Sequence, residues 1–150
     1  MPKYAVEGNA ATSTTLSTVA AFNARTTTQL RRLKHYFVSI GFPGTPGDIE
    51  IEMIGQRYTA DGTPSAVTPT PLDPADAAAC GIGSEDNSVE PTYTAGEIWL
   101  SLPVHQRNTL VYYAPEAPFI TPAADEDGLG WQADASSGTP SCTVTMHAEE

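Results

Sequence analysis

The sequence predicts an all-β fold, and more closely an antiparallel β-sandwich of jelly-roll type. The first observation is the segment Asp48–Arg57, in which Ile49, Ile51 and Met53 alternate with polar or charged residues at the two-residue period of a strand. The second is that this alternation returns towards the C-terminus, between segments rich in Pro, Gly, Thr and Asp that favour turns. The third is that no segment has the composition of a long helix. A chain of 150 residues is expected to form one domain with its own core.

Residues 1–30 are expected to form an N-terminal arm together with the first strands. Tyr4–Glu7 and Thr12–Val19 are the strand candidates, and Ala20–Leu30 is expected to add at most a helical turn because its three consecutive threonines are β-branched. Arg31–Ile40 is a stronger strand, rich in aromatic and β-branched residues. After a Gly- and Pro-rich turn, Asp48–Tyr58 is the next strand.

Residues 60–96 are expected to form one long extended loop. Prolines recur through this segment, three of them in Thr68–Pro74, which favours a conformation near polyproline II. Asp73 is a suitable N-cap for one helical turn. Two interpretations stay open: an arm that grips a neighbouring subunit, or a surface loop that stays on its own domain.

Strands resume after this segment, and about eight or nine strands in all suit a jelly roll. The predicted C-terminal strands are Glu97–Pro103, Asn108–Tyr113, Ala117–Thr121, Leu129–Ala133 and Cys142–His147.

The chain is strongly acidic, with a formal net charge of -11. Such a surface repels nucleic acid and anionic membranes, so neither is expected as a partner. Four of the seven Lys and Arg residues fall between positions 25 and 34: Arg25, Arg31, Arg32 and Lys34. This cluster is either a solvated turn and strand edge or a positive spot that docks on an acidic partner surface.

No residue pattern indicates catalysis, so the chain is expected not to be an enzyme and to use no cofactor or metal. There is no Gly-x-Ser-x-Gly segment and no phosphate-binding Gly-rich loop. His35, His105 and His147 are far apart and lack the spacing of a zinc site. The acidic runs Asp125–Gly128 and Glu85–Ser88 are interpreted as solvated turns, with calcium binding as the alternative.

The aromatic and cysteine residues leave further alternatives open. Trp99, Trp131 and the pair Tyr112–Tyr113 either fill the core and an interface or pave a sugar-binding face. Cys142 is expected in the core, since it alternates with Val144 and Met146, while a disulfide to Cys80 stays open. No secretory signal and no apolar stretch of bilayer length are recognised, so synthesis in a cytosol is expected.

Several residues are candidates for an interface with another protein. Arg57 and Arg107 adjoin strands, where an arginine either locks carboxylates of a partner or remains a solvated charge. His105 suits a strand end or an interface better than a general base. The complete set of candidates is Arg25, Arg31, Arg32, Arg57, Leu72, Asp73, His105 and Arg107.

Three groups of segments together carry a resemblance: Gly44–Glu52 with Gln56–Thr63; Thr70–Ala78; and Glu90–Glu97 with Val104–Thr109, Ala114–Glu116 and Ile120–Ala123. In this order they resemble a group of small proteins that tailed bacteriophages and prophages encode near their head genes. The resemblance covers about positions 30 to 135 and consists of turn and strand patterns. Cys80 and Cys142 are not part of the pattern.

The resemblance implies a virion component that decorates and stabilises the capsid. Its implied partners are the major capsid protein and further copies of itself, as a homotrimer, and its implied place is the capsid exterior after synthesis in the host bacterial cytoplasm. The alternative is a glycan- or receptor-binding module of a phage fibre. Residues 1–30 and 60–96 are expected to carry much of the contact between subunits.

Overall fold

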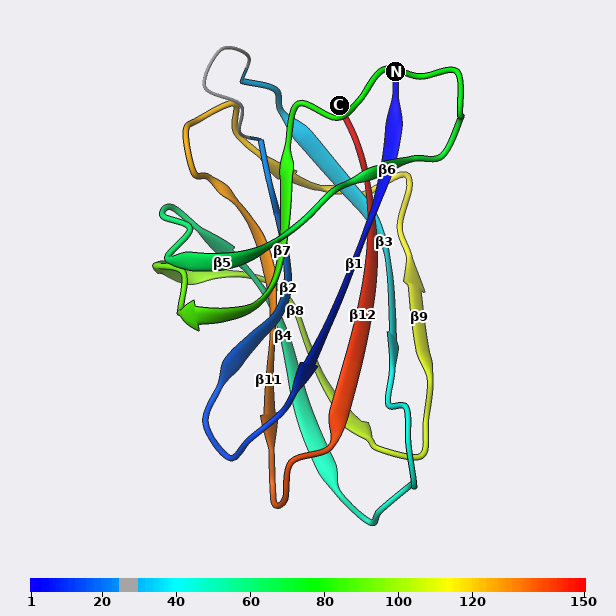
Figure 1. Ribbon diagram of the computed structural model, residues 1–150, viewed down its shortest axis with the longest axis vertical. Coiled ribbons are helices and arrows are strands. Elements are labelled where there is room, and N and C mark those ends of the chain that lie inside the picture. Colours follow the sequence, from blue (N-terminus) through cyan, green and yellow to red (C-terminus); the bar gives the residue numbers. More distant parts are fainter. Residues whose placement is uncertain (25–29) are drawn as a thin grey trace.

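The computed structural model describes residues 1–24 and 30–150, and this part of the chain forms two antiparallel six-stranded sheets packed face to face (Figure 1). The first sheet, sheet A, contains β1 (Lys3–Ala11), β3 (Leu33–Gly41), β6 (Thr70–Pro71), β9 (Leu110–Tyr113), β10 (Phe119–Thr121) and β12 (Ser141–Glu149). The second, sheet B, contains β2 (Ser17–Asn23), β4 (Glu50–Tyr58), β5 (Thr63–Val67), β7 (Ile82–Val89), β8 (Tyr93–His105) and β11 (Gly128–Ala135). The predicted all-β sandwich is confirmed.

The strand order is that of a jelly roll. In sheet A the neighbours run β10-β3-β12-β1-β6, with β9 also paired to β3, and in sheet B they run β5-β7-β2-β11-β4-β8. Four antiparallel pairs are therefore nested one inside the other along the chain: β1 with β12, β2 with β11, β3 with β9 and β10, and β4 with β8. Successive pairs belong alternately to sheet A and sheet B, and this alternation is the double Greek-key arrangement of a jelly roll.

The core lies between the sheets and follows the predicted alternation. In β4, Ile51 and Met53 are buried while Glu50 and Glu52 are exposed. Cys142 also lies in the core, as predicted, together with the large buried ring of Trp131. Neither cysteine forms a disulfide.

The prediction of one extended loop at residues 60–96 is wrong, because the segment holds β5, β6 and β7. Strand β7 pairs with β2 and β5 pairs with β7, which widens sheet B by two strands, while β6 extends sheet A beside β1. The prolines that favour a loop are accommodated at edges: Pro64 lies in the edge strand β5 and Pro71 in the two-residue edge strand β6. Residues 60–96 thus pack on their own domain. This agrees with the second of the two interpretations, a segment that stays on its own domain.

The boundaries near the N-terminus also differ from the prediction. Strand β1 is longer than Tyr4–Glu7, and β2 spans Ser17–Asn23 where a strand at Thr12–Val19 and a helical turn after it were expected. Both strands lie inside their sheets, so residues 1–24 do not form a projecting arm. Tertiary burial explains the shift, since Ala20, Ala21 and Phe22 are completely buried although alanine has little intrinsic strand preference.

The outer face of sheet B is covered at its centre, where the chain entering β8 crosses it. Tyr93 packs over Gly130, whose missing Cβ leaves room for the tyrosine hydroxyl. Glu90 accepts hydrogen bonds from the backbone N–H (3.0 Å) and the hydroxyl of Thr18. Both faces of β2 and β11 are therefore buried. No helix able to cross a bilayer occurs in residues 1–24 and 30–150.

Candidate interaction surface

A bulge in β3 places two adjacent aromatic residues on the outer face of sheet A. Leu33 and His35 are buried, and the alternation then breaks so that Tyr36 and Phe37 both lie on the half-exposed side. The register with β12 shifts at the same point: Phe37 pairs with His147, whereas the next residue of β12 pairs with His35. The bulge thus turns one strand position into an additional outward-facing ring.

These rings form the centre of an apolar surface, here named the outer patch, made of Tyr36, Phe37, Val111, Tyr113 and His147. The Phe37 and His147 rings stack with 4.4 Å between centroids, and Tyr36 meets Tyr113 edge-on at 6.1 Å. Val111 and Tyr113 are 63% and 64% exposed. Burial lowers the pKa of His147, which favours the neutral ring within the patch.

A hollow of about 250 Å³ adjoins the outer patch and is here named the Lys3 hollow. Its lining combines apolar surface with two lysines and one carboxylate: Lys3, Lys34, Tyr36, Tyr113, Pro115, Pro118, Ile120 and Glu149. Lys3 Nζ lies 5.5 Å from the centre of the Tyr36 ring, and Lys34 Nζ lies 3.4 Å from Glu149 Oε1. The hollow therefore suits a partner group that is apolar with acidic neighbours.

The candidate residues of the basic cluster lie close to this hollow along the chain. Arg31 and Arg32 are exposed in the segment that leads directly into β3, which carries Lys34. Arg25 lies outside the described residues. Lys3 and Lys34 both lie beside Glu149 at one end of sheet A, and Arg31 and Arg32 immediately precede the same end of β3.

Arg57 is engaged within its own monomer. Its guanidinium donates to both carboxylate oxygens of Asp127, at 2.8 and 2.6 Å, and to Glu97 Oε2 at 2.7 Å. These hydrogen bonds raise the pKa of Arg57. Neither interpretation of Arg57 holds, because the arginine is not a solvated charge and its bidentate partner Asp127 belongs to this chain and not to another protein.

The remaining candidates are spread over the molecule. His105 contacts Asp48 at 3.1 Å and Arg107 is exposed, both near the β8–β9 connection. Leu72 and Asp73 are exposed in the turn after β6, at the opposite edge of sheet A from β9. Leu72 and Asp73 thus lie beside sheet A, which carries the outer patch. His105 and Arg107 lie at the end of β8 of sheet B, away from Leu72 and Asp73.

The turn after β6 is well defined. Asp73 Oδ1 accepts from the N–H of Ala75 at 2.9 Å, and the N–H of Asp76 donates to the carbonyl of Asp73 at 3.0 Å. This fits the predicted capping role of Asp73, although no helix follows.

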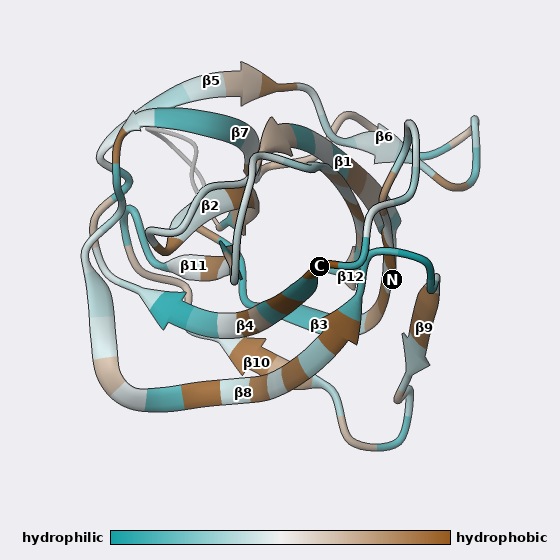
Figure 2. Cartoon of the chain, turned by 90° about the horizontal axis from the view of Figure 1, so that it is seen from below, coloured by the Kyte–Doolittle hydropathy of each residue, from teal (hydrophilic) through white to brown (hydrophobic). Residues whose placement is uncertain are grey.

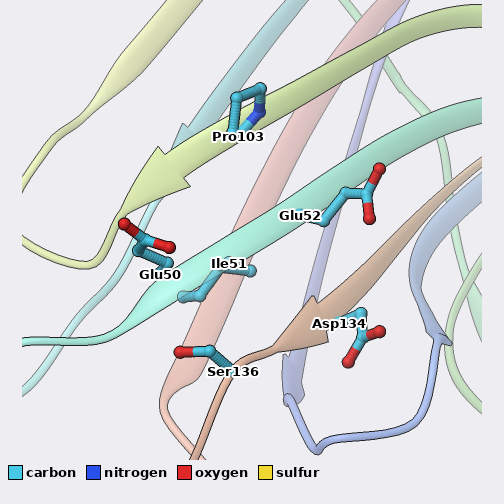
Figure 3. Close-up of a pocket in the computed structure, with 6 residues that line it drawn as sticks. All are labelled: Glu50, Ile51, Glu52, Pro103, Asp134 and Ser136. Carbon is cyan, nitrogen blue, oxygen red and sulfur yellow. The ribbon is translucent and has the colours of Figure 1, made fainter.

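An acidic depression of about 330 Å³ lies on the opposite side, over sheet B. Glu50 and Glu52 from β4 and Asp134 from β11 border it, and Figure 3 shows their carboxylates apart from one another without a common point. Within the described residues, no three His, Cys, Asp or Glu side chains are placed to hold a metal ion. The acidic run at Asp125–Gly128 is shaped instead by the ion pair between Asp127 and Arg57.

The tryptophans do not pave a sugar-binding face. Trp131 is completely buried, and half-buried Trp99 packs against Trp131, Tyr112 and Phe119, where it closes the side of the sandwich between β8 and the β9–β10 edge. The interpretation as core is confirmed for Trp131.

The outer patch and the Lys3 hollow were not predicted from the sequence. Tyr36, Phe37 and His147 lie in segments correctly predicted as strands, but their outward direction was not inferred. One signal was present: adjacent Tyr36 and Phe37 interrupt the alternation between buried His35 and Val38, which is the mark of a bulge.

The chain was compared with protein-family models, with curated proteins and with solved structures, and none of the three comparisons gave a match.

Proposed function

We propose that this protein is a structural virion protein that decorates and stabilises a bacteriophage capsid by binding the surface of the shell. The observation that carries the proposal is the outer patch, an aromatic and aliphatic surface on the outer face of sheet A whose Val111 and Tyr113 are exposed. Apolar side chains gathered on one face are typical of protein–protein contact sites. The jelly roll is a fold found among capsid proteins, which supports the proposal by analogy only.

The distribution of charge supports a binding role for the sheet A side. The side over sheet B carries Glu50, Glu52 and Asp134, whereas Lys3 and Lys34 lie beside the outer patch. A molecule with one apolar, locally basic side and one acidic side is suited to lie with the first on a shell and the second towards solvent.

The experiment uses particles produced by the genome that encodes this chain. The protein is expected to co-purify with them in many copies, as repeated shell sites require, and its deletion is expected to lower the heat resistance of the particles. Quantitative mass spectrometry of gradient-purified particles measures the copy number. Absence from the particles would overturn the proposal, and a few copies per particle would favour a fibre module.

A matched pair of variants locates the contact. Val111→Asp places a charge in the outer patch and is expected to reduce the amount of protein bound to particles at least tenfold, which corresponds to about 1.4 kcal/mol. Val89→Asp, at a similarly exposed valine (57%) in β7 of sheet B, is expected to bind like the wild type. Equal binding by both variants would show that the outer patch is not the contact.

The alternative function, a glycan-binding module, depends on exposed aromatic rings. Tyr113 of the outer patch is the exposed ring that favours it. Binding of the isolated protein to a glycan array, abolished by Tyr113→Ala, would support this alternative in place of decoration.

A further inference from the structure

We propose that neighbouring copies of this protein contact each other by inserting the turn Leu72–Asp76 of one copy into the Lys3 hollow of the next. This inference deepens the proposed function, since it names how the decorating subunits join one another.

The hollow provides an apolar floor with positive groups. Tyr36, Tyr113 and Ile120 supply apolar surface. Lys3 and Lys34 supply positive charges, and Lys34 pairs with Glu149 at 3.4 Å, so the hollow keeps a net positive charge through Lys3. Ile120 is 41% exposed and Tyr113 is 64% exposed, so both retain surface that a partner can bury. At about 250 Å³ the hollow has room for one aliphatic side chain and its flanking backbone.

The turn offers the complementary chemistry. Leu72 is 45% exposed, and Asp73 and Asp76 follow it within four positions. In the described part of the chain, neither aspartate forms an ion pair with a lysine or arginine, so both carboxylates are available to a neighbour's lysines. The turn therefore presents one apolar side chain between Pro71 and two negative charges.

The turn is also preorganised, which lowers the entropy lost on docking. The N–H of Leu72 donates to the carbonyl of Lys3 at 2.8 Å, and two hydrogen bonds at Asp73 close the turn. Pro71 and Pro74 restrict the backbone on either side of Leu72 and Asp73.

Electrostatic complementarity favours the contact between turn and hollow over other contacts between two copies. With a net charge of -11, most pairs of surfaces on two copies bring carboxylates against carboxylates. Lys3 and Lys34 both line the Lys3 hollow, so the acidic turn finds opposite charge there.

The positions of the turn and the hollow allow the contacts to close. Both lie on the sheet A side, and in Figure 2 the turn after β6 and strand β9 are both at the right, with the N-terminus between them. Lys3 borders the hollow and also the depression beneath the turn. A symmetric arrangement of copies can therefore fill every hollow with a neighbour's turn.

The test measures self-association of the full chain without particles, by sedimentation equilibrium over a range of protein concentrations. The wild type is expected to associate, and more weakly at high salt because the contact includes exposed charges. Leu72→Asp and Lys34→Glu are each expected to weaken association at least tenfold, while circular dichroism reports an unchanged fold.

Controls and a charge swap make the result specific. Ile98→Asp and Arg107→Glu introduce the same charge changes at exposed positions away from the hollow and are expected to associate like the wild type. The double variant Lys34→Glu with Asp76→Lys exchanges the charges across the contact and is expected to regain association lost by Lys34→Glu alone.

A wild type that stays monomeric at all concentrations would overturn the inference, as would association that Leu72→Asp leaves intact or that the controls weaken equally. Particle binding separates this inference from the proposed function. A Leu72→Asp chain that is monomeric in solution yet still adds to particles supports both the contact and the decoration role. A wild type that associates through these residues yet does not add to particles supports the contact alone.

Discussion

Gly8 shows how closely the two sheets approach at one residue. It lies in β1 of sheet A, opposite β2 of sheet B, and a Cβ at this position would lie 2.5 Å from the Val19 carbonyl oxygen and 2.6 Å from the Ala20 Cβ. Real Cβ atoms do not come so near to backbone, so the absence of a side chain sets the sheet separation here.

Gly8→Ala is therefore expected to destabilise the protein by about 1–3 kcal/mol, because the added methyl group forces the sheets apart. Urea unfolding measures the change in the free energy of unfolding. Gly41→Ala is the matched control, since a Cβ at Gly41, also in sheet A, meets nothing within 4 Å, and its expected effect is within about 0.5 kcal/mol. A similar loss in both variants would exclude close approach as the role of Gly8.

His35 is a titratable group enclosed in the core. Its ring is completely buried, meets Phe22 edge-on, and has Nε2 3.4 Å from the Thr121 hydroxyl. Burial lowers the pKa of His35 to about 3 because the charged ring loses its hydration.

This pKa makes stability depend on pH in a defined window. In the unfolded chain the histidine pKa is about 6.5, so the unfolded state binds the proton first and stability falls as pH drops from about 6.5 towards 3. Between pH 7 and pH 5 the part due to His35 is expected to be about 2 kcal/mol. Denaturant unfolding at both pH values measures it; His35→Gln is expected to lose this part of the pH dependence, whereas His147→Gln retains it. An unchanged pH dependence in His35→Gln would contradict the prediction.

At the scale of elements, both edges of sheet A are interrupted. The β3 edge of sheet A is covered by two short strands, β9 and β10, separated by a connection that contains Pro115 and Pro118. The opposite edge ends in the two-residue strand β6. Such short, proline-bearing edges oppose the pairing of sheet A with strands of other chains, which favours contact through side chains on the face of this sheet.

The ion-pair cluster of Arg57 joins three elements at one end of sheet B. Arg57 lies in β4, Glu97 in β8, and Asp127 immediately before β11. The Asp127 side chain is only 6% exposed, so its charge depends on Arg57 for compensation.

Arg57→Met is expected to destabilise the protein by about 3 kcal/mol, because it leaves the Asp127 carboxylate buried without its partner. The double variant Arg57→Met with Asp127→Asn is expected to recover part of this loss, and thermal or urea unfolding measures both. Arg107→Met, which removes an exposed arginine, is the control with little expected effect. Additive effects of the two substitutions would show that the pair does not act as a unit.

At the scale of the whole molecule, the two sheets turn different chemistry outward. The outer face of sheet B is covered at its centre by Tyr93 and bordered by carboxylates, whereas the outer face of sheet A carries the outer patch and the Lys3 hollow. The contacts proposed above, with a shell and with neighbouring copies, all use the sheet A side. This polarity is what a subunit layered on a surface requires.

The sequence by itself determined the fold class and most of the strands, because alternation of apolar and polar residues is a local property that burial of one sheet face enforces. This is seen in β4, where Ile51 and Met53 are buried as predicted. It failed at β2 and at β5, β6 and β7, whose positions depend on the strands beside them. In β2, Ala20 and Ala21 form a strand because they are enclosed, not because alanine favours one.

Only the tertiary structure decided where the candidate site lies. The outer patch and the Lys3 hollow combine residues from β1, β3, β9, β10 and β12, which span nearly the whole chain and meet through the nested pairing of the jelly roll. No local pattern records that Lys3 lies near Tyr36, or that the bulge in β3 turns both Tyr36 and Phe37 outward. Which side chains become neighbours depends on the register between strands that are distant in sequence. That register exists only in the assembled sheet.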